Sequence, residues 1–538
     1  MKKRTLLVLF VILLLAGCLR FWQLSRVPVS LDWDDVSVGY NAYSILKTGK
    51  DEFGNFLPPA IRSLDDYKPA MYTYFSVPSI AIFGLNSFAV RFPNALFGTL
   101  TVLFFFFLVR EIFKKDEISL VSAFLFAISS WSIQFSRFAH ETNIALGFNI
   151  LITLFFLKGL KKAKYLLIAG VLSGLSLYTY QSAKIFTPLL ILSLVLIFRK
   201  ELFILSRKII ASSIVLGFLI CLPMFLFILT NTNSLSRAKD VGFLSNTTRT
   251  LGDKYVQKIT ADRNSNDLIG LIVDNRRIVY AKTFINNYLS HFDLNWLFIT
   301  GDSNIGRHQP PRMGHLYLIE LPFLMFGLFL LFFGKYDKKI KLLVFYWILI
   351  TPIAAAISWD VPNAGRTLNF LPMFMILIAL GILESIRFKK YLIFPIVFLF
   401  TFNFIYYLNQ YFVQQNYFQY FSWQYGYEKI VPQIQEIEKN YKEIIVSNRS
   451  PLEQSYIFFL FYLKYPPQSY QEIATSGAYG VKHEFAKYKF DQLNWQKGNP
   501  DILYIGGPND FPTEALINFK KIVYNPNGSP AMLAVSGE

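Results

Sequence analysis

Long apolar runs separated by short polar segments occupy the sequence from about residue 5 to residue 411. A helix needs about 20 consecutive, mostly apolar residues to cross a bilayer. By that rule, about eleven runs predict a transmembrane helix. They lie near residues 5–24, 88–113, 119–136, 143–160, 164–181, 184–199, 208–230, 315–334, 340–358, 367–386 and 391–411. The pattern predicts a mainly α-helical, polytopic membrane protein.

Basic residues gather in alternate connections between these predicted spans. If the basic N-terminus is cytoplasmic, the cytoplasmic connections are residues 114–115, 158–164, 199–208, 335–341 and 387–390, and all of them contain lysine or arginine. Cytoplasmic loops carry such an excess of positive charge. We therefore expect a multi-pass protein of the cell membrane with a cytoplasmic N-terminus. Two long loops, 25–87 and 231–314, and everything after about residue 412 are then extracytoplasmic.

The first apolar run admits a second interpretation. A basic start followed by an apolar stretch and Leu15-Ala16-Gly17-Cys18 resembles a bacterial lipoprotein signal. Apolar and aromatic residues continue beyond Cys18, however, and bring the run to about 20 residues, the length of a span. We favour an uncleaved first helix.

Outside the spans, the pattern predicts two kinds of structure. Mixed apolar and polar stretches near residues 34–46 and 69–83 of the first loop predict helices at the membrane surface, with Pro69 in a first helical turn. After residue 412, candidate strands at 444–446 and 502–505 alternate with helical stretches such as 427–441. We expect a membrane domain at 1–411 and a small extracytoplasmic α/β domain at 412–538.

Composition supports a membrane protein and excludes several other classes. Of 538 residues, 53% are hydrophobic and 16% charged, with a mean hydropathy of +0.37. The net charge of +18 comes from short clusters between apolar runs, so it does not indicate a nucleic-acid partner. The two cysteines, Cys18 and Cys221, lie in apolar stretches and offer neither a disulfide framework nor a metal site.

Three carboxylates follow the first span directly, in Asp32-Trp33-Asp34-Asp35. Acidic groups crowded near a low dielectric tend to have raised pKa values and are kept for proton transfer, metal binding or cation pathways. The plainer alternative is a solvated loop with an aspartate that caps the next helix. We take Asp34 and Asp35 as candidate catalytic residues.

A second charged group lies later in the same loop, in Asp65-Asp66-Tyr67-Lys68. Lys68 could meet an anionic ligand at the membrane surface. It could equally be a surface lysine paired with Asp65 or Asp66. All three are candidate substrate-binding residues.

Other polar residues gather at the outer ends of the spans. Each alone is more often a snorkelling or helix-capping residue than a ligand. Together, carboxylates and cations on one membrane face suit a site that deprotonates an acceptor and holds a phosphate. The candidates are Arg137, His140, Glu141, Tyr180, Lys184, Arg307, His308 and Arg366.

Several common chemistries lack their signatures in this sequence. A G-x-S-x-G nucleophile elbow, an H-E-x-x-H zinc helix and a Walker A loop are absent. A secondary transporter would place ionisable or Gly/Pro-broken segments near the bilayer midplane, whereas most spans here are plain Leu, Phe and Ile at their middles.

At these residues the sequence resembles the GT-C membrane glycosyltransferases, in the branch of protein O-mannosyltransferases and lipid A aminoarabinose transferases. The similar segments are residues 31–42 (LDWDDVSVGYNA), 47–54 (KTGKDEFG), 68–74 (KPAMYTY), 83–93 (FGLNSFAVRFP), 137–143 (RFAHETN), 174–184 (GLSLYTYQSAK), 297–318 and 363–372. They cover most of the membrane part but not the C-terminal region. The resemblance implies a GT-C-like fold.

The resemblance also implies roles for individual residues. Relatives carry an acidic pair, commonly Asp-Glu, in the first external loop, where this chain has Asp34-Asp35. Asp34 would be the base, while Asp35 departs from the usual Glu. Lys68 matches a Lys-Pro-Pro element in which Ala70 replaces the second proline, and it would contact the lipid phosphate. Arg366 is a weaker candidate for that phosphate, and Lys184 and Arg307 are weaker still.

The implied reaction moves a sugar from a polyprenyl-phosphate donor to a lipid, glycan or protein acceptor on the extracytoplasmic face. A single displacement would invert the anomeric centre. Because the donor carries its own leaving phosphate, the reaction requires no nucleotide site and no cofactor. We assign no metal ligand, although Asp34, Asp35, Asp65, Asp66 and His308 leave a divalent cation open.

Two other functions remain possible from the sequence. A polyprenyl-lipid transporter or flippase would share an apolar groove and a basic mouth without needing Asp34. An envelope scaffold that binds partners through the C-terminal domain would depend on the residues after about 425 instead.

Overall fold

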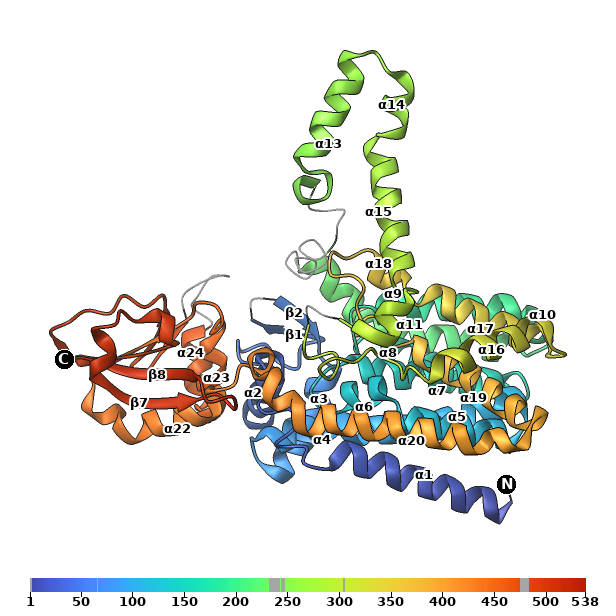
Figure 1. Cartoon of the computed structure of the whole chain (residues 1–538), viewed down its shortest axis with the longest axis horizontal. Helices are drawn as coiled ribbons and strands as arrows, with labels where there is room; N and C mark the ends of the chain where they lie inside the picture. Colours follow the sequence, from blue (N-terminus) through green and yellow to red (C-terminus); the bar gives the residue numbers. More distant parts are fainter. Residues whose placement is uncertain (1, 65, 232–241, 243–246, 303–304, 475–482) are drawn as a thin grey trace.

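A computed structural model describes residues 2–64, 66–231, 242, 247–302, 305–474 and 483–538. Most of the chain up to residue 418 is helical, and a mixed α/β unit follows (Figure 1).

Each predicted span contains an apolar helix in the structure. Among the described residues, seven helices are long and apolar enough to cross a membrane, counting segments that continue one another as one. They contain α1 (Lys3–Phe21), α4 (Ser87–Phe113), α7 (Thr142–Gly159), α11 (Arg207–Thr230), α17 (Lys338–Ile350), α19 (Phe370–Phe388) and α20 (Ile393–Asn409).

The other predicted spans are bent or short. The pair α5 (Asp116–Ile128) and α6 (Ser130–Ser136) bends by 57° and would make an eighth crossing. Three shorter apolar helices occupy the remaining runs, α8 (Tyr165–Ser176), α9 (Ala183–Ile197) and α16 (Glu320–Phe333). The structure thus confirms a multi-pass helical bundle, while the count of eleven crossings stays a prediction.

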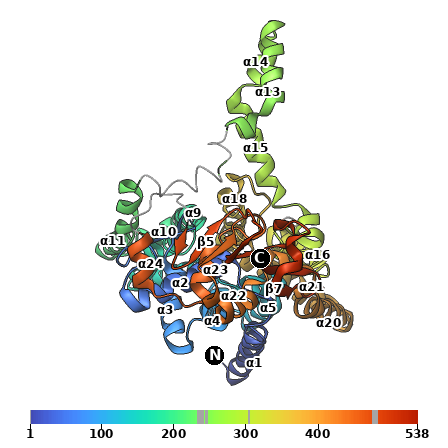
Figure 2. The same cartoon turned by 90° about the vertical axis from the view of Figure 1, so that its left-hand side faces the viewer.

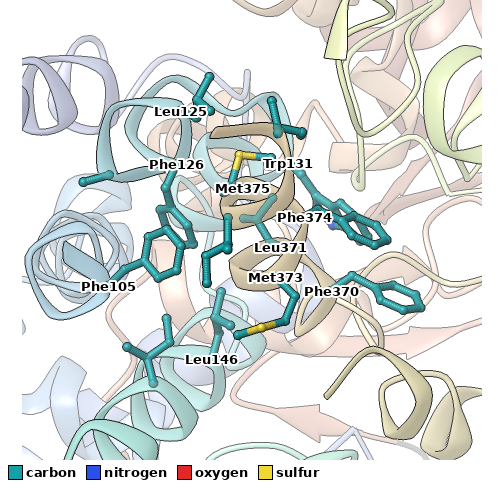
Figure 3. Close-up of a cluster of buried hydrophobic side chains, with 14 of the residues drawn as sticks. Phe105, Leu125, Phe126, Trp131, Leu146, Phe370, Leu371, Met373, Phe374 and Met375 are labelled. Atoms are coloured by element: carbon teal, nitrogen blue, oxygen red, sulfur yellow. The ribbon is translucent and has the colours of Figure 1, made fainter. Parts of the chain in front are cut away.

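Helix α19 lies at the centre of the bundle. Its residues Phe370, Leu371 and Met375 are buried against side chains of neighbouring helices such as Phe105 and Trp131 (Figure 3). Helix α16 packs closely on it, because a Cβ at Gly327 would lie 1.8 Å from the Leu377 carbonyl oxygen. Small residues allow such close approach between helices in a membrane.

The first long loop folds into helix α2 (Trp33–Thr48), a hairpin of β1 (Ala60–Ser63) and β2 (Asp66–Pro69), and helix α3 (Met71–Phe83). Both predicted helices are present. The expectation that Pro69 lies in a first helical turn is wrong, because Pro69 pairs with Ala60 at the end of β2. The hairpin was not predicted from the sequence.

The second long loop also contains helices that the sequence analysis did not identify. Helices α13 (Thr247–Asn264), α14 (Leu268–Val273) and α15 (Arg276–Ser290) form an arm that projects from the bundle (Figures 1 and 2). Helix α15 packs against the bundle at its base, where Asn287 donates to the carbonyl oxygens of Ala356 and Ser358, each at 3.2 Å.

The C-terminal unit is a six-stranded sheet with helices. The strands are β3 (Glu443–Ser447), β4 (Glu484–Phe485), β5 (Tyr488–Asp491), β6 (Asn499–Gly506), β7 (Phe519–Tyr524) and β8 (Pro530–Gly537), in the order β4-β5-β3-β6-β8-β7. Strand β3 is parallel to β5 and β6, and the other pairs are antiparallel. The helices are α22 (Tyr427–Ile437), α23 (Ser455–Tyr462) and α24 (Pro467–Ala474).

This unit shares a hydrophobic core with helix α2. The core joins Val36 and Tyr40 of α2 to Phe458 of α23. A Cβ at Gly39 would lie 2.5 Å from the Phe461 ring, so a larger residue would force that ring to shift. The C-terminal unit is therefore packed directly on the helix that carries the acidic cluster.

Candidate functional site

The acidic cluster is organised by the start of helix α2. The side chain of Asp32 caps the helix by accepting the Asp35 N–H at 2.8 Å. An aspartate is among the preferred residues at this position because its oxygen pairs with an otherwise unpaired helical N–H. The plain capping role considered from the sequence is thus correct for Asp32. It places Asp34 and Asp35 in the first helical turn.

Asp34 forms the centre of an ion cluster. It makes a salt bridge with Lys68 of strand β2, and its second oxygen lies 3.5 Å from the guanidinium of Arg307. Arg307 also pairs with Asp32. Burial alone would lower the pKa of Arg307, but Asp32, Asp34 and Asp35 outweigh that effect and raise it. Arg307 therefore stays charged beside the Asp34 carboxylate, whose side chain is 35% exposed.

Asp35 has a different environment from its neighbour. It is fully buried, its Oδ1 accepts the Ala139 N–H at 2.7 Å, and its Oδ2 lies 3.5 Å from Nε of Arg91. Burial, followed by the nearby charge of Asp32, raises the pKa of Asp35 to about 8. At neutral pH the buried carboxyl therefore favours its protonated form. Asp34, not Asp35, faces an accessible space in which it could take a proton.

Arg91 supports this arrangement and was not selected from the sequence. Its guanidinium is fully buried and donates to the carbonyl oxygens of Leu24 (3.1 Å), Pro28 (2.9 Å) and Ser30. It therefore holds the segment that leads into α2. An arginine inside a predicted span is itself an indication of function, because a charge there is costly unless it is paired.

A buried network supports the loop that carries Arg307. The carboxylate of Asp302 accepts the indole N–H of Trp296 at 2.7 Å and the Ala364 N–H at 2.8 Å, and it lies 2.5 Å from Nδ1 of His308. Burial opposes ionisation, but the adjacent rings of His308 and His315 lower the pKa of Asp302. His308 is thus engaged in this network, next to the cation that reaches Asp34.

Arg137 was predicted to bind substrate, but its side chain is fully occupied by contacts inside the protein. All of its N–H donors are used inside the protein. They go to the hydroxyl of Tyr411 and to the carbonyl oxygens of Leu19, Arg20, Trp22 and Val27. A guanidinium has five N–H donors, so none is left for a ligand. The geometry favours a structural role at the end of α1.

Three other candidates form a second group. The ring of His140 lies 5.3 Å from that of Tyr180 and 6.1 Å from that of His308, between ring centroids. Glu141 follows at the N-cap position of α7. This group adjoins the network of Asp302 through His308.

The remaining candidates occupy separate places. Lys184 donates to Gln181 at 2.7 Å, and Gln181 donates to the Tyr67 carbonyl at 3.1 Å, so Lys184 is tied to the strand that carries Lys68. The side chain of Asp66 accepts the Tyr67 N–H at 2.7 Å. Arg366 donates to the Asp360 carbonyl at 3.1 Å and to Ser358. Asp65 lies outside the described residues.

No group of three or more His, Cys, Asp or Glu side chains within the described part of the chain is arranged to hold a metal ion. The site that the structure does assemble consists of carboxylates and cations at the junction of α2, β2 and the Arg307 loop. Its two cations, Lys68 and Arg307, pair with the carboxylates of Asp34 and Asp32.

Comparisons with known proteins agree on a fold. Residues 67–227 match the model of the dolichyl-phosphate-mannose-protein mannosyltransferase family. No curated protein gives a significant match to the sequence. Two solved structures are similar over nearly the whole chain at low sequence identity.

The first is that of ArnT from Cupriavidus metallidurans bound to undecaprenyl phosphate, with 13% identity and a TM-score of 0.56 over 99% of this chain and 97% of that one. The second is that of the archaeal oligosaccharyltransferase AglB from Archaeoglobus fulgidus, in complex with an inhibitory peptide and a dolichol-phosphate. It has 13% identity and a TM-score of 0.51 over 100% of this chain and 74% of that one. The architecture is therefore shared with these proteins.

Proposed function

We propose that the chain is a GT-C membrane glycosyltransferase that transfers a sugar from a polyprenyl-phosphate donor to a lipid, glycan or protein acceptor. The family match over residues 67–227 and the fold shared with ArnT and AglB support this proposal. The observation that carries this proposal is the convergence of Asp34, Lys68 and Arg307. A base and two phosphate-binding cations are the groups that this reaction needs. The topology predicted from the positive-inside rule places them on the extracytoplasmic face.

The geometry suits a single displacement. The donor phosphate binds Lys68 and Arg307, which now pair with Asp32 and Asp34. The acceptor hydroxyl oxygen forms a bond to the anomeric carbon, and its proton passes to the Asp34 carboxylate. The bond from the anomeric carbon to the phosphate oxygen breaks, and its electrons leave with the phosphate. The two cations stabilise that developing charge, and the anomeric centre is inverted.

The two carboxylates divide their roles by exposure. Asp34 is open to a substrate, whereas Asp35 is buried and oriented by Ala139 and Arg91. Asp35 therefore helps to position the start of α2 rather than accepting the proton of the acceptor.

The experiment that tests this proposal uses purified protein in lipid and a mixed pool of radiolabelled polyprenyl-phosphate sugars. Wild type is expected to release or transfer one sugar class. Asp34→Asn should reduce that rate about 10²–10⁴-fold, the usual contribution of a positioned base. Asp293→Asn is a suitable control, because Asp293 is exposed and its side chain accepts only the Asn295 N–H among the described residues.

A flippase is the competing function, since its groove and basic mouth would look the same. Transport of the lipid would then survive in Asp34→Asn, and no donor would be consumed by wild type. Donor consumption that is equal in wild type and Asp34→Asn would instead show that Asp34 is not the base.

A further inference from the structure

The C-terminal unit contains a cavity of about 280 Å³ that the proposed reaction does not use. It lies where the segment 420–425 enters the unit, and it is walled by the loops after strands β3 and β6 and by the turn between β7 and β8. This volume is near the lower end of the range of roughly 300–1,000 Å³ for small-molecule sites.

The sheet topology independently points to a ligand at this place. Strands β3 and β6 are parallel neighbours. The chain leaves β3 toward β5 on one side of the sheet, and it leaves β6 toward β8 on the other. Ligands in such sheets bind in the crevice beyond the carboxyl ends of the strands, at the point where the strand order reverses. The lining residues Leu452 and Gly507 come from the two diverging loops.

The lining has the chemistry of a site for an uncharged, hydroxyl-rich molecule. Aromatic rings come from Tyr420, Phe421 and Tyr425, and Phe421 is 63% exposed. Amides come from Gln424, Asn509 and Asn525. Amide groups both donate and accept hydrogen bonds, as sugar hydroxyls do, and aromatic rings can cover the apolar face of a pyranose.

The only charged side chain among the lining residues is Asp510. One of its oxygens accepts the Gly507 N–H at 2.8 Å, and its other oxygen has no hydrogen bond within the described residues. A carboxylate accepts hydrogen bonds from hydroxyl groups but repels phosphates and carboxylates. The lining therefore disfavours the lipid phosphate of the donor as the occupant.

Hydrogen bonds join the segment that lines the cavity to residues next to the ion cluster in the chain. The side-chain oxygen of Gln424 accepts the N–H of Trp33, the residue before Asp34, at 2.9 Å. Five residues earlier, Gln419 donates to the carbonyl oxygen of Gln309, two residues after Arg307, at 3.1 Å. The segment 419–425 thus bonds to Trp33 and Gln309, and it also forms one wall of the cavity.

We infer that this cavity binds a carbohydrate portion of the acceptor, so that the acceptor of the proposed reaction is a glycan or a glycan-bearing molecule. This inference rests on the proposed function, because only a transferase has an acceptor. Binding of a sugar at the cavity can nevertheless be tested without catalysis. Gln424 couples an occupied cavity to the position of Asp34.

The test uses the full chain in lipid nanodiscs, applied to a glycan array and, separately, to an array of peptides rich in serine and threonine. Phe421→Ala removes one exposed ring of the lining. Phe519→Ala is a matched control, because Phe519 is 51% exposed on the same unit and does not line the cavity. Donor hydrolysis by wild type is measured in parallel.

We expect wild type and Phe519→Ala to bind one glycan class equally, and Phe421→Ala to bind it about tenfold more weakly, which corresponds to about 1.4 kcal/mol. Asn509→Ala changes an exposed lining residue and should weaken binding of the same glycan. The inference is overturned if no glycan binds, if Phe421→Ala binds as well as the control, or if only peptides bind. If wild type neither hydrolyses the donor nor transfers its sugar to the glycan that it binds, the proposed function is refuted and the glycan result stays intact.

Discussion

Replacing Asp35 with asparagine removes an ionisable group from a fully buried site while nearly conserving its size. In the wild-type protein, burial and then the charge of Asp32 raise the pKa of Asp35 to about 8. An aspartate in an unfolded chain titrates near about 3.9. The folded protein thus keeps a proton that the unfolded chain has lost. This contribution to stability is fully present below about pH 4 and is lost as the pH rises through about 8.

The size of the effect follows from the difference between the two pKa values. Each unit of difference is worth about 1.36 kcal/mol, so between pH 5 and pH 8 the free energy of unfolding falls by at most roughly 4 kcal/mol. Asparagine cannot titrate and lacks this slope. Its amide also replaces the carboxyl oxygen that lies 3.5 Å from Nε of Arg91, and the loss of this contact adds a cost that does not come from titration at position 35.

The assay compares the apparent melting temperatures of wild type and Asp35→Asn in identical nanodiscs between pH 5 and pH 8.5. We expect the wild-type value to fall with rising pH relative to the variant. The control Asp293→Asn, at an exposed carboxylate, should stay parallel to wild type. Infrared spectra at pH 7 should show a protonated carboxyl in wild type that is missing in Asp35→Asn. Parallel melting curves for wild type and Asp35→Asn would refute a raised pKa and restore Asp35 as a charged partner of Arg91.

Three further substitutions test the assembly of the site. Lys68→Ala removes a cation paired with Asp34 and should lower donor turnover about 10²-fold, the scale of one lost electrostatic contact; unchanged turnover would rule out a role at the phosphate. Arg137→Met leaves buried carbonyl oxygens unpaired and should destabilise the protein by at least about 1–3 kcal/mol, the cost of one unpaired buried group, whereas a wild-type melting temperature with lost donor binding would support the substrate role instead. Gly39→Leu should overpack the contact with Phe461, lower the free energy of unfolding by about 1–3 kcal/mol and speed proteolysis of the C-terminal unit. Phe461→Leu in the same chain should partly restore resistance, and equal proteolysis of all variants would contradict this packing.

Local pattern was enough to identify the helices and the acidic cluster. Apolar run length predicts the helices of the bundle, because spanning a bilayer requires one length and one composition. Asp34 and Lys68 were selected from the sequence, and the structure brings them into contact. The β1–β2 hairpin was missed because its strands are four residues each and show no clear alternation.

The different surroundings of Asp34 and Asp35 were decided by tertiary structure. Adjacent residues of one type are equivalent in a sequence, but successive side chains of a helix point in different directions. Asp35 turns toward Arg91 and the Ala139 N–H, while Asp34 turns toward Lys68. Their exposure differs because segments distant in the chain cover Asp35 and leave Asp34 partly exposed.

The sequence by itself determined that the chain is a helical membrane protein and that its acidic and basic candidates gather outside the spans, since hydrophobic length and charge placement are local properties. Tertiary structure alone decided that Arg307 reaches Asp32 and Asp34 across 273 or more residues, that Arg137 has no donor left for a ligand, and that the C-terminal unit packs on α2. Such contacts form only where the packing of the helices brings buried polar groups close together. Residues far apart in the chain supply those partners, so no local pattern encodes them.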